Sequence, residues 1–258
     1  MAFCREYILH YAKSLACLPS LDAVTQKLSE VLAEKKISLS RLFNLVQYDP
    51  ALSSKIIAVA NSAWHNRGVP IVNLKRAMIA LGLEEVKDVL ICALFYDGVL
   101  KKWGLRREQV FHLWQHSLLA AFAARALCSQ EQKDMEKAFT AGLFHDIGKV
   151  PLQLLFHYSI DGENLGWDEV CPKERERFGT DHQEIGFYMA TEWKLPEEYR
   201  HAMRLHHEIN GGSPLADLVK QANILIVAPT EDPELLAIKT AAEANAGRAI
   251  SLFAGNAE

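Results

Sequence analysis

The sequence predicts an all-α fold. Apolar residues recur at intervals of three and four along most of the 258 residues, which is typical of one face of a helix. No segment alternates apolar and polar residues in the way that indicates a half-buried strand. Half of the residues are apolar and 23% are charged, which is the composition of a globular protein with a substantial core. We therefore expect an N-terminal multi-helix array packed on a helical core that the second part of the chain forms.

The first part of the chain, residues 1–102, is expected to be the N-terminal helical subdomain. Its predicted helices cover residues 3–17, 21–33, 39–47, 51–63, 74–81 and 84–100. Asn73 is typical of a helix N-cap, and Gly82 suits the left-handed conformation that ends a helix. A DNA-binding helix-turn-helix is the alternative for this region. It is disfavoured because the helix that follows Asn73 contains only Lys75 and Arg76 as basic residues.

Residues 103–228 are expected to form the helical core, and residues 229–258 a C-terminal helical tail. The predicted helices cover residues 109–128, 137–147, 182–193, 195–207, 215–227 and, in the tail, 234–245, with a further apolar segment at 152–156. The stretch 159–180 is polar and contains three glycines and Pro172. We expect it to be the longest irregular region, able to cover a pocket.

Composition excludes several classes of function. The net charge is −4 and the basic residues are scattered, so no nucleic-acid-binding surface is expected. No apolar stretch reaches the roughly 20 residues that cross a bilayer, and the start of the chain does not resemble a signal peptide. We therefore expect a cytoplasmic protein without a membrane partner. The five cysteines form no C-x-x-C pair, and Cys17, Cys92 and Cys128 lie in apolar patterns that predict buried free thiols.

Metal-capable side chains are placed on several predicted helices. They are His116, His145, Asp146, His182, His206 and His207. Imidazole and carboxylate groups are the ligands of catalytic transition-metal sites. Taken singly, His116 is typical of a hydrogen-bonded core histidine, and His145-Asp146 of a helix end with a buried ion pair. Lys149, close to that pair, would orient a phosphate or a metal-bound hydroxide without itself binding the metal.

Seven short motifs occur in a fixed order along the chain. They are YDPAL at 48–52, ANSA at 60–63, LWQHS at 113–117, AGLFHDIG at 141–148, DHQEIG at 181–186, WKLP at 193–196 and HHE at 206–208. This ordered set resembles the HDOD family, named for an HD-related output domain, within the HD phosphohydrolase superfamily. The resemblance covers about residues 18–215. It implies an all-helical module of bacterial signal transduction, in which a helical array joins an HD-like core.

The resemblance also implies a set of metal ligands. His116 matches the first ligand of the superfamily, and His145 and Asp146 match its defining pair. His182, His206 and His207 are expected to complete the site. The metal would be a divalent ion of iron, manganese, magnesium or nickel.

One position departs from the pattern of active relatives. Their fourth ligand is an aspartate in an Ala-Asp dipeptide, whereas this chain has Asn223 after Ala222. An asparagine offers a neutral carbonyl oxygen, so a dication would be bound more weakly. Asp217 would not substitute, because six residues correspond to about 240° around a helix.

Two functions follow from the resemblance. The favoured hypothesis is a non-catalytic HDOD protein that acts by binding a signalling protein or a nucleotide-like ligand. The alternative is a metal-dependent phosphohydrolase of a nucleotide or cyclic dinucleotide, with Lys149 and Arg204 holding phosphates. Against the alternative stand Asn223 and the absence of a Gly-Tyr-Pro signature, which residues 206–214 match only loosely.

Overall fold

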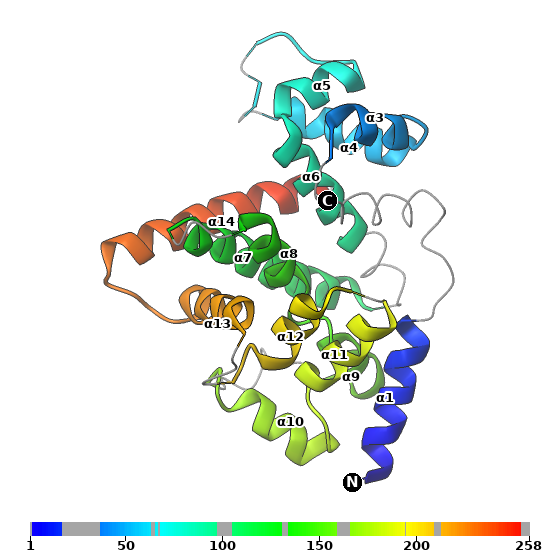
Figure 1. The fold of residues 1–258 in the computed structure, drawn as a ribbon, viewed down its shortest axis with the longest axis vertical. Coiled ribbons are helices and arrows are strands. Elements are labelled where there is room, and N and C mark those ends of the chain that lie inside the picture. The colour runs from blue at the N-terminus through cyan, green and yellow to red at the C-terminus, as the bar shows by residue number, and fades with distance from the viewer. Residues whose placement is uncertain are drawn as a thin grey trace. The chain divides into compact units, whose positions relative to one another are not determined.

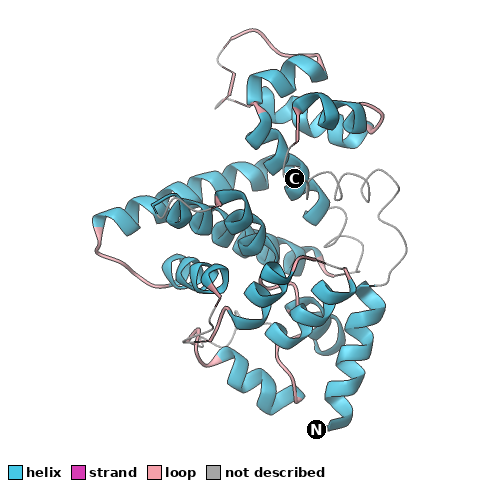
Figure 2. Ribbon diagram, in the orientation of Figure 1, coloured by secondary structure: helices cyan, strands magenta, loops and turns pink. Residues whose placement is uncertain are grey.

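The computed structural model describes residues 2–16, 37–62, 65–66, 68–96, 105–130, 134–158, 166–193, 195–208 and 213–253. Helices joined by turns and loops account for all of these residues, and none of them lies in a strand (Figures 1 and 2). The predicted all-α class is confirmed. Within this described part, no helix is long and apolar enough to span a membrane.

The chain divides into two compact units. One comprises Met1–Leu18 with Gly104–Gly247, and the other comprises Pro19–Trp103 with Arg248–Glu258. The helix α1 (Ala2–Ala16) therefore groups with the helices of the second part, because it packs on α9 (Lys149–Phe156) and α11 (His182–Glu192). The domain limits that we predicted at residues 102 and 228 stay a prediction.

The smaller unit contains α3 (Leu39–Val46), α4 (Pro50–Ala60), α5 (Leu74–Leu81) and α6 (Leu83–Ala93). Asn73 caps α5 by accepting from the N–H of Arg76, and Gly82 ends the helix, as predicted. The φ of Gly82, +83°, is positive, but its ψ of 174° lies outside the left-handed helical conformation that we expected. The ANSA motif has a structural role here. The side-chain amide of Asn61 donates from Nδ2 to the carbonyl of Ile71 at 2.6 Å and accepts the N–H of Ile71 at Oδ1 at 2.7 Å. These two hydrogen bonds fix the loop before α5. The helix predicted at 21–33 lies outside the described residues.

The larger unit is built on the pair α7 (Arg107–Gln130) and α8 (Met135–Phe144), against which α13 (Pro214–Val227) packs. A Cβ at Gly142 would lie 2.7 Å from the Cα of Ala121, so the backbones of α7 and α8 approach closely. Buried apolar side chains, including Trp114 and Phe139, fill the core of this unit. Around it lie α12 (Glu197–Leu205) and α14 (Pro233–Phe253), the latter longer than the predicted 234–245.

The expectation of irregular structure throughout 159–180 was wrong. Residues Val170–Phe178 form a helix, α10. Pro172 is compatible with it because the first turn of a helix has no intrahelical partners for its N–H groups. Gly179, at φ +73°, ends α10 in the left-handed conformation. Cys171 is buried on this helix, and Cys92 and Cys128 are buried free thiols as predicted, whereas Cys17 lies outside the described residues.

Candidate metal centre

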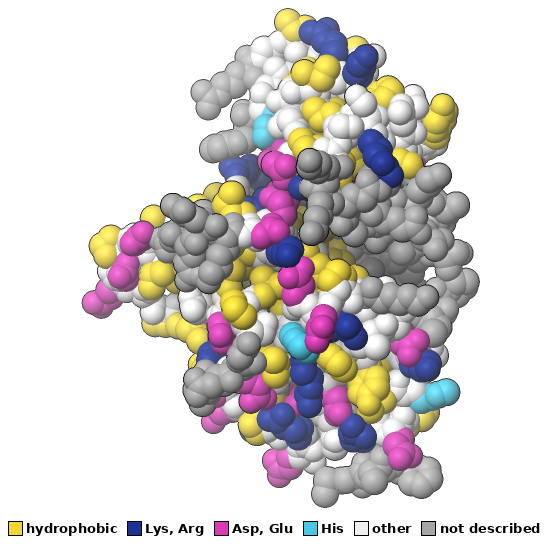
Figure 3. All heavy atoms as spheres, viewed as in Figure 1, with side chains coloured by type: hydrophobic (Ala, Val, Ile, Leu, Met, Phe, Trp, Pro, Cys, Tyr) yellow, Lys and Arg dark blue, Asp and Glu magenta, His cyan; other side chains and the backbone are white. Residues whose placement is uncertain are grey.

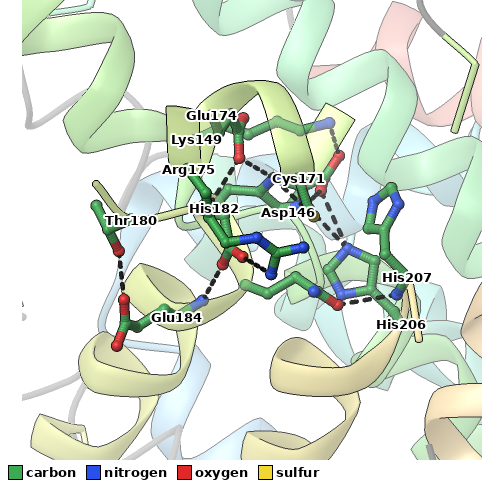
Figure 4. Close-up of polar contacts among 12 residues, drawn as sticks. Asp146, Lys149, Cys171, Glu174, Arg175, Thr180, His182, Glu184, His206 and His207 are labelled. Carbon is green, nitrogen blue, oxygen red and sulfur yellow. Dashed lines mark hydrogen bonds and ion pairs between the residues drawn. The ribbon is translucent and has the colours of Figure 1, made fainter. Parts of the chain in front are cut away.

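Six metal-capable side chains from two helices and two turns converge in the larger unit. They are His116 of α7, His145 and Asp146 after the end of α8, His182 of α11, and His206 and His207 after the end of α12. The side chains of His145, Asp146, His182 and His206 are almost completely buried, while those of His116 and His207 are half-buried. The residues that the sequence placed on separate helices therefore share one site. Figure 4 shows four of them, Asp146, His182, His206 and His207.

The His145-Asp146 pair is positioned by the turn between α8 and α9. Residues 145–148 form this turn, and Gly148 leads into α9. A Cβ at Gly148 would lie only 1.9 Å from the carbonyl oxygen of His182 and 2.6 Å from the N of Gly186. Only a glycine therefore permits the turn to lie directly against the first turn of α11. This approach brings Asp146 close to His182.

The two carboxylate oxygens of Asp146 face different histidines. Its Oδ2 lies 3.1 Å from Nε2 of His116 and 3.3 Å from Nε2 of His145, and these two nitrogens are 3.3 Å apart. Its Oδ1 lies 3.4 Å from Nε2 of His182 and 3.5 Å from Nε2 of His206, which are 3.2 Å apart. Asp146 thus belongs to two groups of possible metal ligands. We call Asp146 with His116 and His145 the first donor group, and Asp146 with His182 and His206 the second.

His207 completes the second donor group. The metal-capable atoms of Asp146, His182, His206 and His207 lie within 4.8 Å of one another. The ring of His207 is 4.6 Å from that of His206 and 5.0 Å from that of His182, measured between centroids. Its backbone N–H donates to Oε1 of Gln183 at 2.8 Å, which fixes the chain after α12.

The Nδ1 atoms of the buried histidines bind acceptors on the protein. His145 Nδ1 lies 2.7 Å from the carbonyl of Gly142, His206 Nδ1 lies 2.9 Å from that of Met203, and His207 Nδ1 lies 2.5 Å from that of Trp167. A carbonyl oxygen can only accept, so each Nδ1 carries the proton. In the neutral imidazole, Nε2 then presents its lone pair to the site.

His182 is held by Glu174, a residue that the sequence analysis missed. Oε2 of Glu174 lies 2.7 Å from Nδ1 of His182 and accepts its backbone N–H at 2.8 Å. Both side chains are fully buried. No motif pointed to Glu174, because it lies on α10, where an irregular region was expected, and its spacing of eight residues from His182 carries no signal in the sequence.

Burial and charge determine the ionisation of the site. Burial lowers the pKa of His182, His206 and His207, so these imidazoles stay neutral. Burial alone would raise the pKa of Asp146, but the charges of its neighbours, Lys149 among them, hold it well below its usual value. Burial raises the pKa of Glu174 to about 8. The centre therefore combines a carboxylate anion with neutral nitrogen donors.

Two buried polar atoms of these groups, and one on α13, have no hydrogen-bond partner among the described residues. They are Oδ1 of Asp146, Nε2 of His207 and Oδ1 of Asn223. A buried acceptor without a partner costs about 1–3 kcal/mol, more if charged. The unsatisfied atoms of Asp146 and His207 belong to a cluster that could hold a metal ion.

The structure also describes the other residues that the sequence analysis named, Asn223, Lys149 and Arg204. Asn223 is buried on α13, which packs on α7, α8 and α12. Lys149 contacts Oδ2 of Asp146, next to the donor groups. Arg204, considered for phosphate, lies 3.7 Å from Asp181, the N-cap of α11, and is engaged there. Cys171 lies 4.0 Å from Nδ1 of His182, but that nitrogen is closer to Glu174, and burial raises the pKa of the thiol.

A family model described as the HDOD domain matches residues 18–209. This chain belongs to the HDOD domain family. Among curated proteins, an uncharacterized protein of Treponema pallidum is 24% identical over 223 residues, which are 81% of this chain and 42% of that protein. A ribonuclease Y of Onion yellows phytoplasma is 32% identical over 110 residues, 43% of this chain and 16% of that enzyme. The chain thus spans less than half the length of these curated relatives.

Solved structures share the HDOD fold. An HDOD domain protein of unknown function from Geobacter sulfurreducens has a TM-score of 0.66 at 20% identity, covering 94% of this chain and 93% of that one. A proposed phosphohydrolase of Shewanella amazonensis has a TM-score of 0.68 at 20% identity, with 95% and 92% covered. A proposed signal transduction protein of Marinobacter aquaeolei has a TM-score of 0.71 at 20% identity, with 95% and 66% covered. At these identities the likeness concerns the fold alone.

Proposed function

We propose that this HDOD domain acts in signal transduction by binding a divalent transition metal and, through it, a phosphate-containing ligand. The observation that carries the proposal is the set of imidazole Nε2 atoms around Asp146 whose lone pairs could bind a metal. His145, His206 and His207 each commit the Nδ1 proton to a backbone carbonyl, which leaves Nε2 as a lone pair in a buried space. These lone pairs and Oδ1 of Asp146 require a cation.

The spacing of the donors fits a shared ion. Ligands about 2.1 Å from one metal lie about 3.0 Å apart at neighbouring octahedral positions and about 3.4 Å apart in a tetrahedron. The distances among Asp146 and the donor nitrogens of His116, His145, His182 and His206 range from 3.1 Å to 3.5 Å, and the donor atom of His207 lies within 4.8 Å of those in its group. Hydrogen-bonded pairs of this kind would be shorter, at about 2.7–2.9 Å for a charge-assisted bond. His116, His145 and Asp146 would hold one ion, and Asp146, His182, His206 and His207 would hold another.

The donor chemistry favours particular metals. Five imidazoles and one carboxylate suit iron or nickel better than magnesium, which prefers oxygen ligands. When bound, a dication supplies Lewis acidity to a phosphoryl oxygen and lowers the pKa of a water molecule. Lys149 places a positive charge beside Asp146, where it would hold a further phosphate oxygen. The half-buried side chain of His116, 28% exposed, marks a side from which a ligand would reach the donors.

Metal analysis of untagged protein tests the proposal. We expect stoichiometric iron, manganese or nickel by inductively coupled plasma mass spectrometry in wild-type protein, and loss of metal in His207→Ala. His201→Ala is the matched control, because His201 of α12 has a side chain that is 45% exposed and lies 3.6 Å from Glu197. Metal-loaded protein should bind inorganic phosphate and AMP, and metal-free protein should not. Wild-type protein that takes up none of these ions would contradict the proposal.

Hydrolysis of a phosphoester is the second candidate function. The arrangement of Asp146, whose two oxygens face different histidine pairs, favours it because two-metal sites stabilise both the attacking and the leaving oxygen. Asn223 argues for weak turnover at most, since a neutral amide replaces the acid of active relatives. Loaded protein should be assayed with bis-p-nitrophenyl phosphate and a cyclic dinucleotide. Turnover that Asp146→Asn abolishes would establish the hydrolase, and binding without turnover would leave the ligand-binding function.

A further inference from the structure

The segment 166–178 contributes to the second donor group without supplying a ligand to it. It consists of a turn at Gly166–Glu169 followed by α10. At one end, the carbonyl of Trp167 accepts from Nδ1 of His207 at 2.5 Å. In its helical part, Glu174 binds Nδ1 and the backbone N–H of His182. One segment therefore contacts the outer nitrogens of two histidines that face Asp146.

The contacts to His207 are reinforced by the Trp167 side chain. Its indole stacks on the imidazole of His207 with ring centroids 6.0 Å apart and planes 26° apart. The ammonium of Lys220 on α13 lies 5.0 Å from the centroid of the same indole and donates to the carbonyl of Glu208 at 3.1 Å. Lys220 thus ties Trp167 to the chain that follows His207.

The contacts to His182 are buried. Glu174 is fully inaccessible and lies on the side of His182 away from Asp146, as Figure 4 shows. Because Oε2 accepts the backbone N–H of His182 as well as facing Nδ1, it fixes both the ring and the first residue of α11. An acceptor oxygen on the outer nitrogen of a ligating histidine, from a carboxyl group or a backbone carbonyl, sets the tautomer and the orientation of the ring.

We propose that residues 166–178 form a metal-responsive clamp, in which Glu174 and the carbonyl of Trp167 position His182 and His207 for the cation held with Asp146 and His206. Glu174 is a positioning residue in this scheme. The proposal rests on the metal-binding function proposed above. It predicts that α10 affects the affinity for metal although none of its side chains is a ligand of the second group. Conversely, bound metal should restrain the segment.

Substitutions on α10 test the effect on affinity. Co²⁺ binding would be measured by titration calorimetry and by its visible absorption, which reports on imidazole ligation. Glu174→Ala should weaken binding about 10- to 100-fold, the usual effect of removing a partner of a ligating histidine. Glu174→Gln, which keeps an oxygen acceptor, should recover part of the loss. Glu176→Ala is the matched control, since Glu176 is exposed on the same helix. Equal affinities of Glu174→Ala and Glu176→Ala would overturn the proposal.

Two further measurements complete the test. Hydrogen exchange of α10 amides should slow when Co²⁺ binds, while amides of α5 in the other unit serve as reference; unchanged exchange of α10 would contradict the clamp. Nitrogen-15 NMR of the metal-free protein reads the tautomers directly. His182 and His207 should carry the proton on Nδ1, and Glu174→Gln should change the signals of His182 but not of His207. A proton on Nε2 of His182 in place of Nδ1 would refute the role of Glu174, even if the protein binds metal. Failure of the wild-type protein to bind metal would refute only the proposed function.

Discussion

A single methyl group at Gly148 should disrupt the metal centre. The Cβ of Gly148→Ala would lie 1.9 Å from the carbonyl oxygen of His182 and 2.6 Å from the N of Gly186, and both atoms belong to the backbone of α11. Real contacts of a Cβ are essentially never under 3.0 Å, so the carbonyl would have to move by about 1.1 Å. No flexible side chain can absorb this shift. The turn that carries Asp146 and the first turn of α11 must therefore separate.

The separation has two measurable consequences. Overpacking of this kind costs about 1–3 kcal/mol of the free energy of unfolding. It also moves Asp146 away from His182, whose Nε2 now lies 3.4 Å from Oδ1. Sites of this type require their groups to be held within about 0.5 Å. We therefore expect metal affinity to fall at least about tenfold, as it does when a supporting contact of a ligand is lost.

Urea denaturation of metal-free protein and Co²⁺ titration would measure the two effects separately. Gly247→Ala is the matched control, because a Cβ there meets no atom within 4 Å and the residue lies in α14. The free energy of unfolding of this control should increase by about 0.5–1 kcal/mol, because alanine is favoured over glycine in a helix. Its metal affinity should equal that of the wild type. Wild-type stability and affinity in Gly148→Ala would refute the assignment of Gly148 as the contact that positions Asp146.

Three other predictions concern charge. Lys149→Met should leave Co²⁺ affinity within about threefold and weaken phosphate binding by metal-loaded protein about tenfold, because it removes one phosphate contact; calorimetry would measure both. Asn223→Asp should increase metal content by mass spectrometry, and unchanged content would argue against this position as a ligand. Burial opposes ionisation of Glu184, yet its bonds to Arg5 and Thr180 lower its pKa below the usual 4.5. The stability that Glu184 contributes is therefore present above pH 4.5 and lost as pH falls through its folded-state pKa, so urea denaturation should show the defect of Glu184→Gln at pH 7 and a smaller one near pH 3.

Much of the fold could be predicted because capping and periodicity are local. Asn73 and Gly82 bound α5 as the sequence indicated, and Asp181 begins α11 by accepting the N–H of Glu184. The error at 159–180 was also local in origin. Glycine and Pro172 were taken as signs of a loop, whereas proline is tolerated in a first helical turn and glycine is favoured just after a helix.

The metal-capable residues could be found from the sequence, but their supporting contacts could not. His145, His182 and His206 were identified by the ordered motifs AGLFHDIG, DHQEIG and HHE, which resemble those of the HDOD family. Their outer nitrogens bind carbonyls of Gly142 and Met203 and the carboxylate of Glu174. A carbonyl acceptor has no signature in the sequence, since every residue has one. Glu174 is eight residues from His182 on a different helix, so only the packing of α10 on α11 pairs them.

Metal binding and catalysis are separable questions in this HDOD domain. The two donor groups share only Asp146, and five of the six donors lie at helix ends whose positions depend on the packing of α8, α11 and α12. A neutral residue at position 223 removes a charge but leaves those helices in place. Hydrolysis needs charged groups placed to stabilise the transition state of the reacting phosphate. Recognition of a phosphate needs only a bound cation and an open ligand position. We therefore expect the second donor group, Asp146 with His182, His206 and His207, to bind metal in the natural protein even if phosphoester hydrolysis is absent. Metal analysis and the hydrolysis assay on the same protein would separate metal binding from catalysis.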